Sequence, residues 1–110
     1  MLFEPGRQRE VVELFSNCVL ISVIRKNWEE GNREIDKYCE MDNEFRISKE
    51  REILNRMIIA VKNKNNEELE RESYLFPTNS QNKDRITALV EKIKEKLKEE
   101  DSYRVDFNPL

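Results

Sequence analysis

The sequence contains no histidine. Histidine is the commonest catalytic acid or base and a very common zinc ligand, so its absence closes many enzyme mechanisms. One group of carboxylates could form a metal site or an acid–base pair, but it lies on or near a polar helix face, where charges are normally solvated. This group consists of Asp36, Glu40, Asp42 and Glu44. We therefore expect no catalytic residue, no metal site and no cofactor.

Glycine and proline are also scarce, with only two and three residues in a chain of 110. The abundant residues are Glu, Lys, Arg, Leu and Ile, which favour helices over a sheet of short strands joined by glycine turns. An apolar content of 37% is enough for one compact core, whereas two globular domains would not fit in this length. We predict an all-α protein with a single helical domain over residues 1–110.

Long apolar runs are missing as well. The longest run, CVLISVI at residues 18–24, is far shorter than the roughly 20 residues that span a bilayer. The N-terminal segment MLFEPGRQRE lacks the charged and then apolar pattern of a signal peptide. We expect a cytoplasmic protein without a membrane span. In a reducing cytosol Cys18 and Cys39 should be free thiols, and a disulfide joining the first two helices is the alternative.

Neither sign of charge dominates, because 20 Lys and Arg residues nearly balance 23 Asp and Glu residues. A nucleic-acid binder usually concentrates positive charge on one face, so this balance argues against nucleic acid as a partner. Four basic residues are candidate contacts to a protein partner, although the sequence assigns no role to any of them. They are Arg56, Lys62, Lys64 and Arg71.

Capping signals divide the chain into helices. Asn27 followed by Glu30, and Asn65 followed by Glu68, are possible capping boxes, and Ser48 is a good N-cap. The segment between the second and third helices has no steady apolar period and is expected to form a polar corner. The expected helices span residues 7–26, 28–42, 49–63, 66–75 and 84–99, and residues 101–110 are expected to form a mostly extended tail.

Two features predict how the first helices pack. Gly31 inside a helix costs about 1 kcal/mol relative to alanine, so we expect it to permit close approach of the preceding helix in an antiparallel hairpin. The stretch Val11–Ile24 has too many apolar residues for one packing face. It should be packed on two sides. The second side would be covered in a homodimer through this helix, or by a preceding helix that is missing from the chain.

The helix lengths also suggest a repeat. Val11–Asp42 and Ser48–Phe76 each have about the span of a tetratricopeptide-type repeat, without its strict consensus. The stretch from Ile86 to Leu97 is clearly amphipathic and should cover the last exposed face. The predicted architecture is the end of a degenerate tetratricopeptide-like α-solenoid, made of short antiparallel helical hairpins with a capping C-terminal helix.

The order of several segments resembles the C-terminal region of the soluble NSF attachment proteins, the SNAP family, with the gamma type as the nearest. These segments are NWEEGNREIDKY, EFRISKEREIL, IIAVKNKNNEEL, then Phe76, then IKEKLKEED, and the resemblance covers about residues 18–101. The residues at the family's positions are Trp28, Phe45, Ser48, Glu50, Ala60, Asn65 and Glu68.

The resemblance implies a non-enzymatic adaptor that binds the AAA ATPase NSF, SNARE complexes, or both, in membrane fusion and vesicle traffic. The positions similar in kind to the family's NSF-binding end are Glu99, Glu100, Asp101, Asp106 and Leu110. SNAP proteins are several times longer than this chain, which would then be a fragment, a truncated paralogue or a mimic. The alternative is a stand-alone helical binding module or inhibitor of phage or pathogen type, in which the chain is dimeric.

Overall fold

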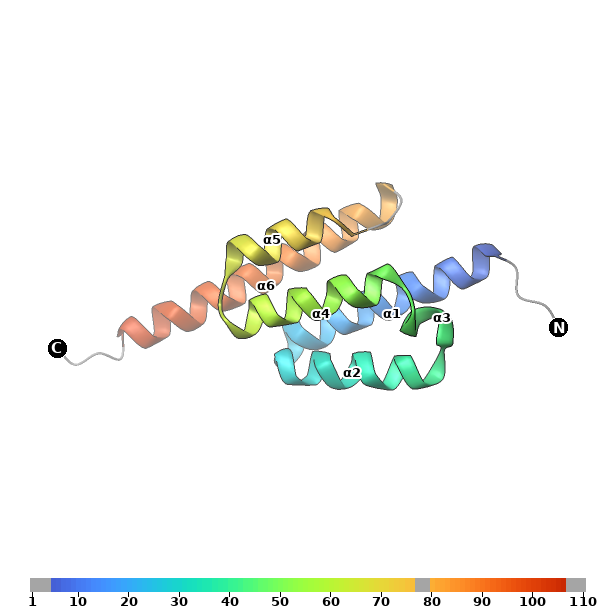
Figure 1. Cartoon of the computed structure of the whole chain (residues 1–110). Coiled ribbons are helices and arrows are strands. Elements are labelled where there is room, and N and C mark those ends of the chain that lie inside the picture. Colours follow the sequence, from blue (N-terminus) through green and yellow to red (C-terminus); the bar gives the residue numbers. More distant parts are fainter. Residues whose placement is uncertain (1–4, 77–79, 107–110) are drawn as a thin grey trace.

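The computed structural model describes the backbone of residues 5–76 and 80–106, and the side chains of residues 10–76 and 82–99. All regular secondary structure in these ranges is helical, which confirms the all-α prediction (Figure 1). The helices are α1 (Pro5–Arg25), α2 (Trp28–Met41), α3 (Asn43–Arg46), α4 (Lys49–Lys62), α5 (Asn66–Tyr74) and α6 (Ser80–Asp106).

The helices begin at the capping residues that the sequence indicates. Asn27, Ser48 and Asn65 each accept a hydrogen bond from the backbone N–H three residues further on, at 2.9, 3.1 and 3.1 Å. Each bond satisfies one of the unpaired amides of a first helical turn. These caps account for the tight corners before α2, α4 and α5.

The corner between α2 and α4 contains a short helix that the sequence did not predict. Asp42 caps α3 by accepting a hydrogen bond from the Glu44 N–H at 3.3 Å. The expected polar corner also contains a fully buried residue, Phe45. A four-residue helix is too short to show an apolar period, so it has no signal in the sequence pattern.

The expected extended tail over residues 101–110 was wrong for residues 101–106. The last helix begins at Ser80 and continues to Asp106, whereas the sequence placed it at residues 84–99. Its amphipathic pattern ends at Leu97, but no glycine or proline occurs between Pro77 and Pro109 to stop a helix. Polar residues alone do not end a helix. Residues 107–110 lie outside the described residues.

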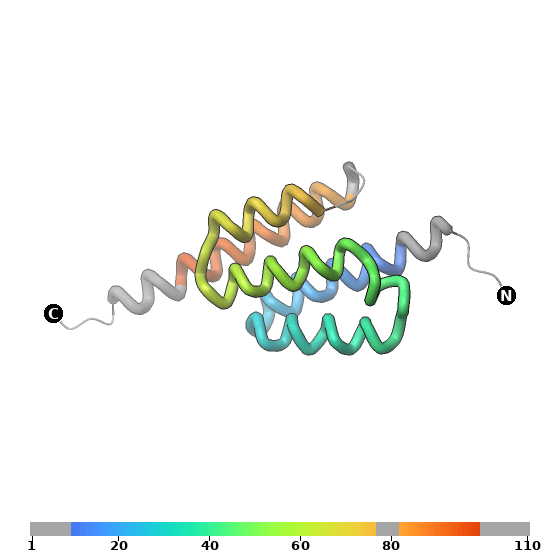
Figure 2. The backbone as a smooth tube through the Cα atoms, in the orientation of Figure 1, coloured from blue at the N-terminus to red at the C-terminus, as the bar shows by residue number. Residues whose placement is uncertain are grey.

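The helices form two antiparallel pairs and a closing helix. Helix α1 pairs with α2, and α4 pairs with α5; Figures 1 and 2 show α2, α4 and α5 in front of α1 and α6. Helix α2 packs on α4, α5 packs on α6, and α6 packs in turn on α1. The C-terminal helix therefore does more than cover the last hairpin, because it also returns to the first helix.

Helix α1 is packed on two sides, as its composition predicts. It contacts both α2 and α6, and Val12, Val19 and Val23 are among its buried side chains. Two apolar side chains of α1 stay exposed: Leu14 at 57% and Ile21 at 40% of their surface. Most of the excess apolar surface that suggested self-association is thus covered within the chain.

The core joins all the longer helices and is closed at one end by three aromatic rings. The Phe15 and Tyr38 rings are stacked with their centroids 4.1 Å apart, and Phe45 meets both rings edge-on at 5.7 and 6.1 Å. This cluster joins α1, α2 and α3, which explains why a helix as short as α3 keeps its place.

An ion pair joins α5 to α6. The Lys94 Nζ lies 2.9 Å from the Oε1 atom of Glu70, and the Oε2 atom of Glu70 accepts a hydrogen bond from the Tyr74 hydroxyl at 2.8 Å. The Lys94 amine, and after it the Tyr74 hydroxyl, hold the pKa of Glu70 below its ordinary value of 4.5. The Glu70 carboxylate raises the pKa of Lys94 above 10.5.

We expect this pair to make stability depend on pH. A depressed carboxyl pKa stabilises the fold above the unfolded value, and the effect is lost as the pH falls through the folded value. A raised amine pKa stabilises the fold below its unfolded value and loses its effect at higher pH, so the contribution is fully present between about pH 5 and pH 10. Urea unfolding of the wild type and of Lys94→Met should differ most near pH 7 and less at about pH 3. A difference that does not change with pH would contradict this assignment, and Lys98→Met, at an exposed position of the same helix, is the control.

Candidate protein-binding end

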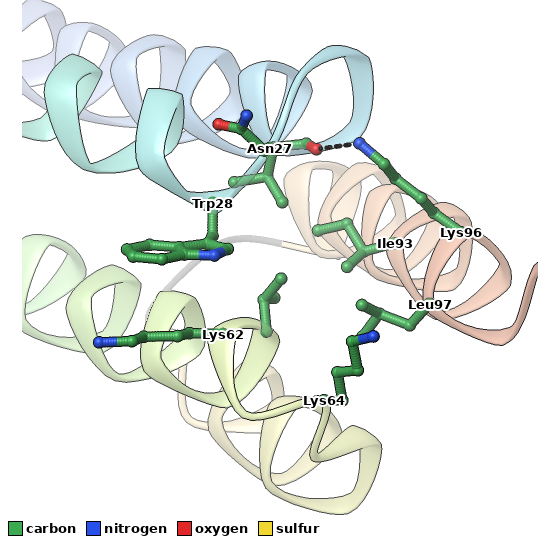
Figure 3. Close-up of a pocket in the computed structure, with 9 residues that line it drawn as sticks. Asn27, Trp28, Lys62, Lys64, Ile93, Lys96 and Leu97 are labelled. Atoms are coloured by element: carbon green, nitrogen blue, oxygen red, sulfur yellow. Dashed lines mark hydrogen bonds between the residues drawn. The ribbon is translucent and has the colours of Figure 1, made fainter. Parts of the chain in front are cut away.

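A pocket lies where the turn between α1 and α2, the C-terminal end of α4 and the second half of α6 meet (Figure 3). Its volume is about 200 Å³. Trp28 from α2 and Ile93 and Leu97 from α6 surround it together with lysines from the end of α4, the turn after α4, and α6 (Figure 3). The lining residues are Val23, Asn27, Trp28, Val61, Lys62, Lys64, Ile93, Lys96 and Leu97.

The turn after α4 places two of these lysines. Lys64 has a φ of 56°, in the left-handed region, and its N–H donates to the Val61 carbonyl at 3.0 Å. The next N–H, of Asn65, donates to the Ala60 carbonyl at 2.8 Å. This pair of bonds is the Schellman motif that commonly ends a helix. It reverses the chain sharply, so that Lys62 and Lys64 lie at different edges of the pocket (Figure 3).

Trp28 forms one wall of the pocket. Its ring is half-buried, and the Lys62 amine lies 5.0 Å from the ring centroid. An ammonium group at this distance is attracted by the negative face of the ring. The contact joins the start of α2 to the end of α4 and keeps a positive charge beside an apolar surface.

Lys96 joins α6 to the end of α1. Its amine donates to the carbonyl oxygens of Val23, Ile24 and Lys26 at 3.0, 3.0 and 2.6 Å. Figure 3 draws one of these bonds. The last carbonyls of a helix have no partner within it, and a cation there also interacts favourably with the negative end of the helix dipole. Lys96 therefore caps the C-terminal end of α1, a role that a residue close in the sequence usually has.

Replacing Lys96 with methionine should lower the free energy of unfolding by about 1–2 kcal/mol, because charged donors are lost from three carbonyl groups. Methionine keeps most of the apolar stem, so the loss reports the amine. Chemical denaturation measures this difference. Lys92→Met, at an exposed position one turn earlier on α6, is the control and should change stability by less than about 0.5 kcal/mol. Equal effects of the two variants would show that the amine of Lys96 does not stabilise the fold.

The acidic residues suggested by the sequence follow the pocket along α6. Glu99 is exposed and lies two residues after the pocket residue Leu97. Glu100, Asp101 and Asp106 belong to the last turns of the same helix, which extends beyond the ends of the neighbouring helices (Figure 1). Leu110 lies outside the described residues.

Two of the four basic residues considered as partner contacts form ion pairs within the chain. Arg56 pairs with Glu72 of α5 at 2.8 Å, and Arg71 pairs with Glu68 at 2.7 Å. The other two, Lys62 and Lys64, line the pocket. Neither Lys96 nor the pocket as a whole could be found from the sequence. The one sequence feature that indicated part of the pocket is the lysine-rich turn KNKN at residues 62–65.

The cysteines and carboxylates form no chemical site in the described part of the chain. Cys18 and Cys39 are both free and half-buried, so the alternative of a disulfide between the first two helices was wrong. Burial raises the pKa of the Cys39 thiol. No group of three His, Cys, Asp or Glu side chains that could hold a metal ion occurs among the described residues. None of the described helices has an apolar stretch of the length that a bilayer span needs.

The fold and the pocket define a class, the all-helical scaffold built from antiparallel helix pairs. Within this class the family model of the soluble NSF attachment protein, SNAP, matches residues 7–98. The chain belongs to the SNAP family, which confirms the resemblance seen in the sequence. Comparisons with curated proteins and with solved structures gave no match.

Proposed function

We propose that this chain is a non-enzymatic, cytoplasmic adaptor that binds the AAA ATPase NSF, SNARE complexes, or both, in membrane fusion and vesicle traffic. The observation that carries the proposal is the family match, which covers residues 7–98. The name of the family describes attachment of NSF. Closer relation to the gamma type stays a prediction.

The contact with NSF is assigned to the acidic end of α6 and the residues after it. Glu99, Glu100, Asp101 and Asp106 all lie in the last eight residues of the helix, near the negative end of its dipole. Of these four residues only Asp106 lies in the last turn, where an acidic side chain interacts unfavourably with the helix dipole, so its charge does not serve the helix itself. A basic surface on the partner would offset this cost. Leu110 is proposed to add an apolar contact.

A pull-down with purified components tests the proposal. The immobilised chain should retain NSF, assembled SNARE complex, or both together, and raising the salt concentration should weaken an interaction carried by acidic residues. Recovery of neither component at low salt would remove the proposal. Sequential addition of the two components distinguishes direct from bridged binding of each.

Self-association through Val11–Ile24 also stays a proposal, now limited to the exposed side chains of Leu14 and Ile21. It belongs to the second candidate function, a stand-alone helical binding module. Light scattering after gel filtration should show a dimer that becomes monomeric in a Leu14→Ser/Ile21→Ser variant. A monomeric wild type would remove this candidate interface.

A further inference from the structure

A groove of about 520 Å³ lies between α1 and α2, and it is lined by residues of this hairpin alone. The same face continues away from the turn along both helices. On α1, Leu14 lies four residues before the groove residue Cys18, and on α2, Met41 lies three residues after the groove residue Tyr38. Leu14 and Met41 are largely exposed, at 57% and 65% of their surface. The end of this face away from the turn is therefore apolar and open.

Near the turn, the two edges of the groove carry opposite charges. Arg25 and Lys26 form a basic edge at the end of α1, and Glu30 and Glu34 form an acidic edge on α2. The hydroxyl of Tyr38, and to a smaller extent the charge of Lys26, hold the pKa of Glu34 below its ordinary value of 4.5. The hairpin face thus has a positive side, a negative side and an apolar end.

These charges are available to a second molecule. The Arg25 and Lys26 side chains are exposed, and neither forms a hydrogen bond or an ion pair with any residue in the described part of the chain. Glu30 and Glu34 each use one carboxylate oxygen, Oε2, in an ion pair with the residue three positions further on. The side chains of those two partners are 72% and 57% exposed, and such surface pairs contribute little and exchange easily with another cation.

We propose that this face binds a second copy of the chain, related by a two-fold axis that runs along the groove. The inference rests on the self-association proposed for Leu14 and Ile21, and it specifies how the two copies pair. A rotation of 180° about such an axis exchanges the two edges of the face and keeps each position along the groove. The basic edge of one copy then meets the acidic edge of the other. Leu14 of one copy meets Met41 of the other, because their neighbours Phe15 and Tyr38 are stacked at the same end of the hairpin.

The charge pattern favours this arrangement over the alternatives. The two hairpins form a four-helix bundle in which each α1 lies antiparallel to the α2 of the other copy. A two-fold axis across the groove would instead place the charged end of each copy on the apolar end of the other, where the charges would be buried without partners. A partner with charges of a single sign would be repelled by one of the two edges.

Charge reversal tests the pairing of the edges. Arg25→Glu/Lys26→Glu makes both edges acidic, and Glu30→Lys/Glu34→Lys makes both edges basic. In sedimentation equilibrium, each variant alone should dimerise with a dissociation constant at least about tenfold higher than that of the wild type, because like charges meet at both contacts. An equimolar mixture of the two variants should regain association at least as strong as that of the wild type, because opposite charges then meet at both contacts.

Matched controls separate this pairing from the effect of net charge. Lys92→Glu/Lys98→Glu on α6 and Glu29→Lys/Asp36→Lys on α2 make the same charge changes at exposed positions outside the groove. Each control, and their mixture, should associate as the wild type does. The concentration series runs from about 1 µM to about 500 µM, since two short helices per copy bury less than a standard interface. A reducing agent keeps the groove residue Cys18 from forming a disulfide.

A second measurement uses the wild-type chain alone and does not depend on the folding of any variant. In a mixture of isotope-labelled and unlabelled copies, filtered NMR spectra should show contacts between the Leu14 methyl groups of one copy and the Met41 methyl group of the other. A chain that is monomeric at every concentration would overturn both this inference and the self-association on which it rests. A dimer that lacks these contacts, or that the mixed charge-reversal variants fail to restore, would overturn the inference alone.

Discussion

Replacing Phe45 with alanine should lower the free energy of unfolding by about 3–5 kcal/mol, as large-to-small changes of fully buried aromatic residues do. None of the Phe45 surface is exposed. Its ring lies edge-on to Phe15 of α1 and Tyr38 of α2, and alanine would leave a cavity where these helices meet α3. Because α3 has only four residues, its place depends on this one side chain.

Urea unfolding followed by circular dichroism measures this loss. The matched control is Ile47→Ala, two residues further on, since 64% of the Ile47 surface is exposed. The control should change stability by less than about 0.5 kcal/mol. A loss below about 1 kcal/mol in Phe45→Ala would mean that the aromatic cluster does not close this end of the core.

Gly31→Leu should destabilise the protein by about 3 kcal/mol, because an added side chain has no room where three helices meet. A Cβ atom at this position would lie 2.6 Å from the Val23 Cγ2 of α1 and 3.1 Å from the Ile58 Cδ1 of α4. Val23 and Ile58 are both buried and β-branched, so neither can easily move away. Even Gly31→Ala should lower stability by about 1 kcal/mol, although alanine favours helix by about 1 kcal/mol.

A double-mutant cycle shows whether the crowding lies where the structure places it. Val23→Ala removes the nearer methyl group, so its cost should be smaller in the Gly31→Ala background than in the wild type, with a coupling of about 1 kcal/mol. Asn32→Ala is the control for helix propensity, since Asn32 is the next residue and is exposed. Additive effects of Gly31→Ala and Val23→Ala would contradict the close approach of α1 and α2.

The sequence was most informative where one local interaction decides the structure. Asn27, Ser48 and Asn65 indicate helix starts because each side chain bonds an amide three residues away, and the structure contains all three bonds. Gly31 indicated a close helix contact for a similarly local reason, and Val23 lies there. The order of such short segments was also enough to suggest the family.

The features that could not be predicted from the sequence depend on contacts between residues that are far apart in the chain. Lys96 donates to carbonyl groups 70 to 73 positions away, and no local pattern distinguishes it from Lys92 or Lys98. The pocket likewise combines residues of three separate segments. The length of α6 was misjudged for a different reason, because the segment after Leu97 contains neither an apolar period nor a helix breaker.

The central proposal is that the acidic end of α6 is the contact for the ATPase. The direct test is a binding titration of the fluorescently labelled chain with NSF. Glu99→Gln/Glu100→Gln/Asp101→Asn should weaken binding at least about tenfold, because three negative charges at the proposed contact are removed. Asp106→Asn and deletion of Leu110 should each weaken binding further. The control Asp36→Asn/Glu40→Gln/Glu44→Gln removes the same charge from exposed positions elsewhere and should bind NSF as the wild type does. Equal affinity of the two triple variants, or no binding of NSF by the wild-type chain, would contradict the account.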